Sequence, residues 1–86
     1  MVVQVFSILD AKTGAFGQPF FAFNAAVAQR TVAAVLMQGD SLVGKFPQDY
    51  QLFHIGRFDD ASGELMAIAP VSVCNVASLK EVVHAS

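Results

Sequence analysis

Hydrophobic residues gather in four stretches that predict strands. Residues 2–9 carry β-branched and aromatic side chains on both alternating faces, which predicts a buried central strand. Residues 20–23 predict a short edge strand, because Pro19 cannot donate to a strand ladder. Residues 50–58 and a strand from Leu65 to Ala69 or beyond flank a turn that ends in glycine, which predicts a hairpin.

The alternation within residues 50–58 predicts two faces for that strand. One face would carry Leu52, His54 and Phe58, and the other Phe53, Ile55 and Arg57. Gly14, Gly56 and Gly63 are expected to set turns. Pro70 predicts an edge or a bulge at the far end of the last strand.

An Ala-rich run predicts a helix over residues 25–38, with Asn24 as its N-cap and Gly39 at its end. Arg30 is the single charged residue of this run, and the apolar residues spread over more than one face. We therefore expect the helix to be covered on two sides in its assembled form. Ala33 is predicted to face solvent in the isolated domain.

Residues 40–49 predict a loop, because Gly44 and Pro47 interrupt regular structure. A capping-box pattern predicts one or two helical turns within residues 78–83. The order strand, helix, strand, strand predicts one α+β domain over residues 1–86. We expect a three- to four-stranded, mostly antiparallel sheet with one long helix packed on a face and a short C-terminal helix.

The composition adds the expectation of a partner surface. Hydrophobic residues make up 55% of the 86 residues and charged residues 14%. A chain of this size buries only about 60 to 65% of the surface it exposes when unfolded. So much apolar surface in so small a domain favours association with another molecule.

The charge balance limits which partners are expected. Five basic residues stand against seven acidic ones, for a net charge of -2. Binding that depends on the phosphate backbone alone is expected to require an excess of basic residues. No apolar run reaches the ~18 residues of a membrane span, no signal-peptide pattern is present, and the single cysteine, Cys74, cannot form an internal disulfide. We expect a soluble intracellular protein without membrane contact.

Few residues are suited to catalysis or metal binding. His54 lies between apolar neighbours, where a buried structural role is favoured over a catalytic one, and His84 is near the end of the chain. Asp59 and Asp60 precede a Ser-Gly pair, which is typical of a turn. Cys74 is expected to pack as a small apolar side chain. We therefore expect no enzyme activity, no metal and no cofactor.

The aromatic residues are the strongest indication of a binding site. Eight Phe and one Tyr occur without Trp, and several lie in loops or at element ends beside lysines. Such rings can stack single-stranded bases, but in a chain this small the core or an oligomer interface is the favoured place for them. The candidate nucleic-acid-binding residues are Lys12, Phe16, Phe20, Arg30, Lys45, Phe46, Tyr50 and Arg57. The candidate oligomer interface on the helix consists of Val27, Thr31, Ala34 and Val35.

Four blocks of sequence resemble the small nonstructural protein of gokushovirus-type microviruses, which are phages with circular single-stranded DNA genomes. The blocks are Asp10-x-Lys12-x-Gly14-x-Phe16-x-x-Pro19-Phe20, then Asn24 with Ala28 and Arg30, then Phe46-Pro47-x-Asp49-Tyr50-x-Leu52, and Gly56-x-Phe58-Asp59-Asp60-x-x-Gly63. The similarity extends over residues 5–68. The resemblance implies a phage protein of the host bacterial cytoplasm that acts in genome replication.

Two functions remain open from the sequence. In the first, the protein is a nonenzymatic replication accessory that binds single-stranded DNA, with a homo-oligomer multiplying a weak site. In the second, it is a protein-interaction module that engages the replication initiator or the procapsid without touching DNA. The near-absence of charge on residues 25–38 is the basis for the second.

Overall fold

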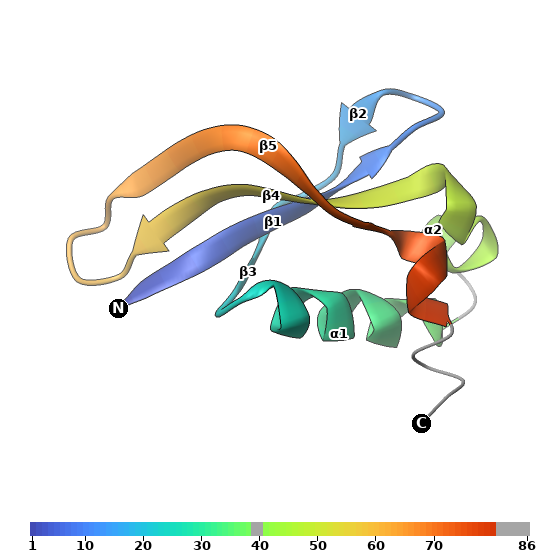
Figure 1. Ribbon diagram of the computed structural model, residues 1–86, viewed down its shortest axis with the longest axis horizontal. Helices are drawn as coiled ribbons and strands as arrows, with labels where there is room; N and C mark the ends of the chain where they lie inside the picture. Colours follow the sequence, from blue (N-terminus) through green and yellow to red (C-terminus); the bar gives the residue numbers. More distant parts are fainter. Residues whose placement is uncertain (39–40, 81–86) are drawn as a thin grey trace.

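The computed structural model describes residues 1–38 and 41–80 and has the predicted α+β architecture (Figure 1). Its strands are β1 (Val2–Asp10), β2 (Ala15–Phe16), β3 (Phe20–Ala22), β4 (Tyr50–Asp59) and β5 (Leu65–Asn75). Its helices are α1 (Ala25–Leu36) and α2 (Leu42–Lys45), with 3-10 turns η1 (Pro47–Asp49) and η2 (Val76–Ser78).

All five strands belong to one antiparallel sheet. Four of them follow the order β2-β1-β4-β5, and the fifth, β3, also pairs with β1. β1 is central, as predicted, because β4 pairs along one of its edges while β3 and then β2 pair along the other. β2 was not predicted, and it brings the sheet to five strands instead of three or four. It is only two residues long, and Gly14, at a φ of 74°, makes the turn that returns the chain to β1.

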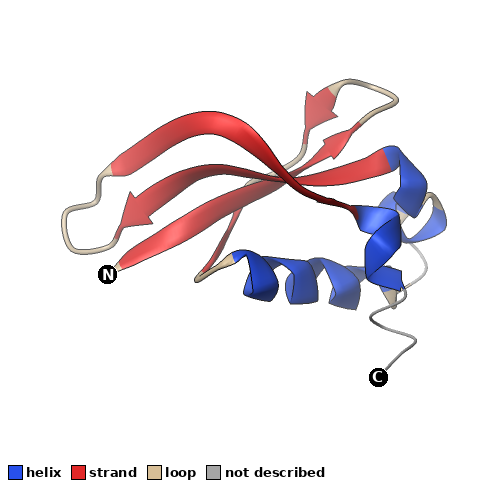
Figure 2. Ribbon diagram, viewed as in Figure 1, coloured by secondary structure: helices blue, strands red, loops and turns tan. Residues whose placement is uncertain are grey.

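The helical segments gather on one side of the strands (Figure 2). Phe6 of β1 and Leu52 of β4 lie in the core against α1, whose side chains Val32 and Leu36 are also buried. Ala33 is buried as well, so its predicted solvent exposure is wrong. Val76 and Leu79, which follow β5, close the other end of this core.

A β-bulge in β4 overturns the predicted alternation of that strand. His54 is opposite Phe6 and Gly56 is opposite Val5, so Ile55 is an extra residue without a partner on β1. Beyond the bulge the faces exchange, because directly opposed residues share a face. Phe58 therefore lies on the same face as Phe53, not on that of Leu52 and His54.

Gly56 has a different role from the one predicted, since it lies within β4 and not in a turn. A Cβ at this position would approach the carbonyl oxygen of Met66 on β5 to 2.7 Å. The pairing of β4 with β5 also shifts register between His54 and Gly56, which leaves Pro70 in an irregular part of β5. β5 continues past Pro70 to Asn75, in agreement with a strand predicted to reach Ala69 or beyond.

Within the predicted loop, residues 41–49 contain regular structure. Ser41 caps the short helix α2 by accepting a hydrogen bond from the Gly44 amide, and Pro47 begins η1. At the other end of the chain, Asn75 accepts a hydrogen bond from the Ala77 amide and starts η2 earlier than the predicted start at residue 78. Gly39 and residues 81–83 lie outside the described residues.

Candidate nucleic-acid interface

The sheet face opposite α1 carries four phenylalanine rings in two contacting pairs. The rings of Phe16 and Phe53 meet edge to face with centroids 5.4 Å apart, and those of Phe21 and Phe58 are 5.6 Å apart. The register explains this grouping, because these residues are opposite β1 or β4 residues of the same face. We call this surface the open face.

The open face is apolar and partly solvent-exposed. Its other members in register are Val3, Val5, Ser7, Leu9, Gln51, Gly56, Leu65, Ala67 and Ser72, none of which is charged. Phe16 is 44% exposed and Phe21 is 58% exposed, whereas Val5 and Ser7 between them are buried. The helices of the described chain lie on the other side of the sheet, so the rings are accessible to a partner.

The spacing along β1 sets the distance between the two aromatic pairs. Phe16 is opposite Leu9 and Phe21 is opposite Val5, four residues apart. At about 3.3 Å per residue, the pairs are separated by about 13 Å along the strand. The open face therefore offers two separate aromatic platforms on a rigid sheet.

The structure separates the eight predicted nucleic-acid-binding residues into different places. Phe16 lies on the open face, and the exposed Lys12 lies in the β1–β2 turn that precedes it. Arg57 is exposed but is opposite Gln4, on the other face of β4. Arg30 is exposed on α1, and Lys45 and Phe46 are exposed at the end of α2.

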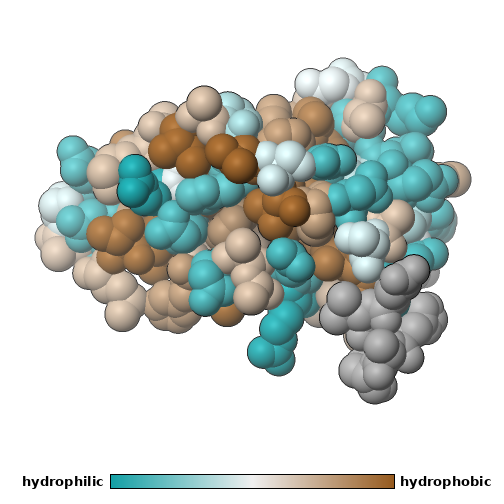
Figure 3. Space-filling model, in the orientation of Figure 1, coloured by the Kyte–Doolittle hydropathy of each residue, from teal (hydrophilic) through white to brown (hydrophobic). Residues whose placement is uncertain are grey.

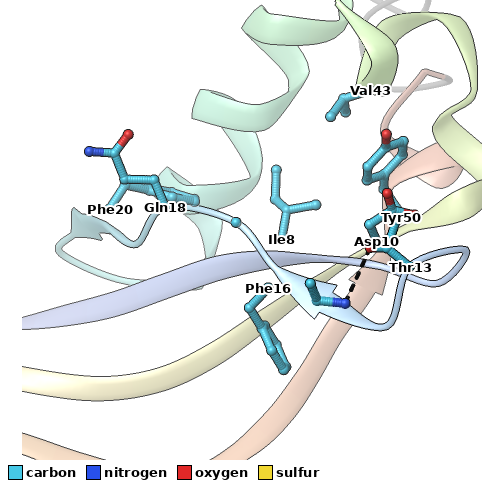
Figure 4. A pocket seen from close by; sticks show the side chains of 10 residues that line it. Ile8, Asp10, Thr13, Phe16, Gln18, Phe20, Val43 and Tyr50 are labelled. Atoms are coloured by element: carbon cyan, nitrogen blue, oxygen red, sulfur yellow. Dashed lines mark hydrogen bonds between the residues drawn. The ribbon is translucent and has the colours of Figure 1, made fainter.

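The remaining two, Phe20 and Tyr50, line a pocket on the α1 side of the sheet (Figure 4). The pocket has a volume of about 400 Å³, and its walls also include Ile8 and Val43. Figure 4 shows that the ring of Phe16 points away from Ile8 and Tyr50, to the other side of β2. The ring of Phe16 thus belongs to the open face, although Phe16 is also among the residues that line the pocket.

Tyr50 and Asp10 are neighbours at one end of this pocket, because they are opposite each other in the β1–β4 register. Partial burial raises the pKa of the Tyr50 phenol, and the negative charges of Asp10 and Asp49 raise that pKa further. The pocket therefore has a negative potential at its Tyr50 end. This potential disfavours a phosphate there.

The predicted oligomer-interface residues form one side of α1. Val27, Thr31 and Ala34 are exposed and Val35 is half-buried, while the opposite side, which includes Ala28 and Val32, is buried. Val27 also borders an apolar groove of about 290 Å³ with Val3, Phe21 and Phe23. The exposed side of α1 is thus continuous with the edge of the sheet at β3.

No pattern in the sequence predicts Phe21, Phe53 and Phe58 as a group. Phe53 and Phe58 were predicted on opposite faces, and only the bulge at Ile55 unites them. Phe21 joins them through a strand pairing between β3 and β1. The contact between the Phe21 and Phe58 rings depends on the registers of β3 and β4 against β1. The alternation of residues within one strand does not predict these registers.

The residues weighed for catalysis have structural contacts. The Nε2 atom of His54 is 2.8 Å from Oε1 of Gln4, and the imidazole lies 5.1 Å from the Phe6 ring. Cys74 packs against the core, and burial raises the pKa of its thiol. Asp59 accepts a hydrogen bond from the Ala61 amide, as expected of a turn, and this bond lowers the pKa of the Asp59 carboxyl.

Within residues 1–38 and 41–80, no three His, Cys, Asp or Glu side chains are grouped to hold a metal ion. None of the helices in the same residues has the length and apolar character needed to cross a membrane.

Hydrophobic side chains also gather over the arc of β5 (Figure 3), where Leu65 and Val71 are more than half exposed. β5 is an edge strand of the sheet, so this apolar surface adjoins an unpaired backbone edge. Pro70 and the irregular register near it interrupt that edge, which is a common protection against pairing with other chains.

Comparison with known proteins identifies a phage family. A family model described as Phage ORF5 protein matches residues 3–79, and no curated protein or solved structure gives a significant match. The match includes both helices and all the strands except Val2, the first residue of β1, and it agrees with the resemblance to the microvirus nonstructural protein. The chain belongs to the phage ORF5 protein family.

Proposed function

We propose that this phage protein is a nonenzymatic accessory factor in the replication of a single-stranded DNA genome, and that it binds single-stranded DNA as a homo-oligomer in the host cytoplasm. The observation that carries the proposal is the open face, with its two pairs of phenylalanine rings outside the core. Aromatic rings on an uncovered sheet are a recurrent platform for unstacked bases.

The chemistry of the open face favours binding without sequence preference. Every base has a flat face that can stack on a ring, and each stacked base contributes about 1 to 3 kcal/mol. The side chains in register on this face are uncharged, so they offer no cation for a phosphate. The nearest cations along the chain are Lys12, in the turn that precedes Phe16, and Arg57, which precedes Phe58 but lies on the other face of β4.

A homo-oligomer would compensate for so few cations. Two linked copies of a weak site bind one strand more tightly than either alone, because the second contact is intramolecular. The exposed side of α1, which carries Val27, Thr31 and Ala34, provides a surface for such association. Association there leaves the open face free, since α1 lies on the other side of the sheet.

The test is fluorescence anisotropy of a labelled oligothymidylate of about 16 nucleotides at about 50 mM and about 200 mM salt. The wild-type protein should bind, with lower affinity at the higher salt concentration. Phe16→Ala and Phe21→Ala should each weaken binding by roughly 5- to 100-fold, which corresponds to the loss of one stacked base. Both rings are exposed, so their removal should leave the fold intact.

Phe46→Ala is the matched control, because Phe46 is exposed to a similar extent, 48%, but lies beyond α2 and not on the sheet. Its affinity should equal that of the wild type. Absence of binding at the lower salt concentration would refute the proposal. Equal effects of the three substitutions would refute the open face as the site.

A protein-interaction module acting on the replication initiator or the procapsid is the second candidate. Its supporting observation is the apolar groove formed by Val3, Phe21, Phe23 and Val27, whose aromatic residues are among the most exposed of the chain. Phe23→Ala discriminates the two functions, because Phe23 lies outside the open-face pairs. The second function predicts that this substitution impairs phage replication while oligonucleotide binding stays at the wild-type level.

A further inference from the structure

The pocket between β1 and α2 has a chemistry that the proposed DNA contact does not use. It lies on the opposite side of the sheet from the open face, and its volume of about 400 Å³ is within the ordinary range of ligand sites. Apolar and aromatic walls come from Ile8, Phe20, Val43 and Tyr50, and polar groups come from Asp10, Thr13 and Gln18.

Among the residues that the structure describes, the Asp10 carboxylate in this pocket has no cationic partner. Its Oδ1 atom accepts a hydrogen bond from the Lys12 amide at 2.9 Å, which fixes the side chain. Throughout residues 1–38 and 41–80, the ion pairs formed are those of the Met1 amine with Asp59 and Asp60. The wall of this apolar pocket therefore carries a carboxylate that is held in place by a hydrogen bond and forms no ion pair within the described residues.

The aromatic walls complement this carboxylate. Figure 4 shows Asp10 and Tyr50 together at one end of the pocket and Phe20 with Gln18 at the other, with Ile8 between them. Partial burial raises the pKa of the Tyr50 phenol, and the negative charges of Asp10 and Asp49 raise it further. A group that enters here meets aromatic surface and negative potential together.

We propose that this pocket receives an arginine side chain from a basic segment of a partner protein. The guanidinium group is planar and cationic, so it can donate to the Asp10 carboxylate while it stacks on the Tyr50 ring. The methylene groups of the side chain would lie along Ile8 and Phe20. The net charge of -2 favours the approach of a basic partner over that of an anion.

The experiment is a titration of the ¹⁵N-labelled full chain, followed by amide shifts, with the peptide acetyl-Gly-Arg-Gly-amide. The shifts should concentrate at Thr13, Gly17 and Tyr50. Asp10→Asn should weaken the apparent affinity about tenfold or more, because it removes a charge-assisted bond. The asparagine oxygen can still accept the hydrogen bond from the Lys12 amide, so the turn is retained.

Glu64→Gln is the control for net charge, since Glu64 is an exposed acid in the distant β4–β5 turn, and it should bind the peptide like the wild type. Gln18→Glu, which adds a carboxylate at the pocket rim, should tighten binding. Equal affinity of Asp10→Asn and wild type would overturn the inference, as would equal or larger pocket shifts with acetyl-Gly-Glu-Gly-amide or with deoxycytidine monophosphate. Oligonucleotide binding by Asp10→Asn tests the open face separately.

Discussion

Gly56 illustrates how one residue sets the path of a strand. It is buried in β4, where an added Cβ would come within 2.7 Å of the Met66 carbonyl oxygen, a backbone atom of the paired strand. Gly56→Ala should therefore destabilise the fold by about 1 to 3 kcal/mol, the usual cost of overpacking. The midpoint of urea unfolding measures the change.

Gly17→Ala is the comparison for Gly56→Ala, because its added Cβ would meet its nearest backbone atom at an ordinary 3.5 Å. This variant should unfold within about 0.5 kcal/mol of the wild type, as most surface substitutions do. If both alanine variants had the wild-type midpoint, the close approach of β4 and β5 at Gly56 would be wrong.

Tyr50 reports directly on the charge of the neighbouring pocket, because it is the single tyrosine in a chain without tryptophan. Its phenolate absorbance should titrate with a pKa above 10.0, owing to burial and then to Asp10 and Asp49. Asp10→Asn should lower that pKa, whereas Glu64→Gln should leave it unchanged. An unchanged value in Asp10→Asn would show that the two side chains do not interact.

The same pKa shift has a consequence for stability. The folded state holds the phenolic proton more tightly than the unfolded state, so the unfolded state loses that proton first as the pH rises. The contribution of Tyr50 to the free energy of unfolding should thus be constant below about pH 10 and decline above it. Tyr50→Phe should remove this part of the alkaline decline.

At the level of single residues, the sequence predicted local roles better than spatial groups. Asn24 as a helix cap and Gly14 and Gly63 as turn residues follow from backbone chemistry, and the structure confirms them. The open face and the pocket depend on pairings between residues far apart in the sequence. Phe16 and Phe53, or Asp10 and Tyr50, meet because of sheet register, which composition and spacing do not encode.

Among the elements, α1 depends most on one identifiable contact at its end. The Asn24 side chain accepts a hydrogen bond from the Val27 amide at 2.9 Å, and the first turn of the helix contains no acidic residue to assist it. Asn24→Ala should lower the free energy of unfolding by about 1 kcal/mol, and Asn24→Asp should retain the wild-type value. Thermal unfolding followed by circular dichroism measures both, and equal losses in the two variants would contradict a capping role.

Long elements with a clear pattern were predictable, and short or irregular ones were not. β1 and α1 have strong patterns over nine and twelve residues, and both were found close to their expected bounds. β2 has two residues and exists because Gly14 returns the chain to β1. The alternation of side chains along β4 does not reveal the bulge at Ile55. The prediction therefore placed Arg57 and Phe58 on the wrong faces of the strand.

In the whole molecule, apolar residues that do not fit into the core lie on separate surfaces. The open face carries the aromatic pairs, the exposed side of α1 carries Val27, Thr31 and Ala34, and the pocket lies between β1 and α2. Because α1 and the open face lie on opposite sides of the sheet, one protein copy can engage another copy and a ligand at the same time. This arrangement makes self-association testable without disturbing the open face.

Ala34→Glu is the variant that tests self-association through α1. Ala34 is exposed on the same side as Thr31, so a glutamate there is tolerated in a monomer, whereas Ala33 is buried and its substitution would damage the core. Burying an unpaired carboxylate in an interface costs several kcal/mol, enough to dissociate a weak oligomer. Light scattering after size-exclusion chromatography should show a wild-type oligomer and a monomeric variant. Ala61→Glu makes the same change in the exposed β4–β5 turn and should remain oligomeric, and a monomeric wild type would exclude this interface altogether.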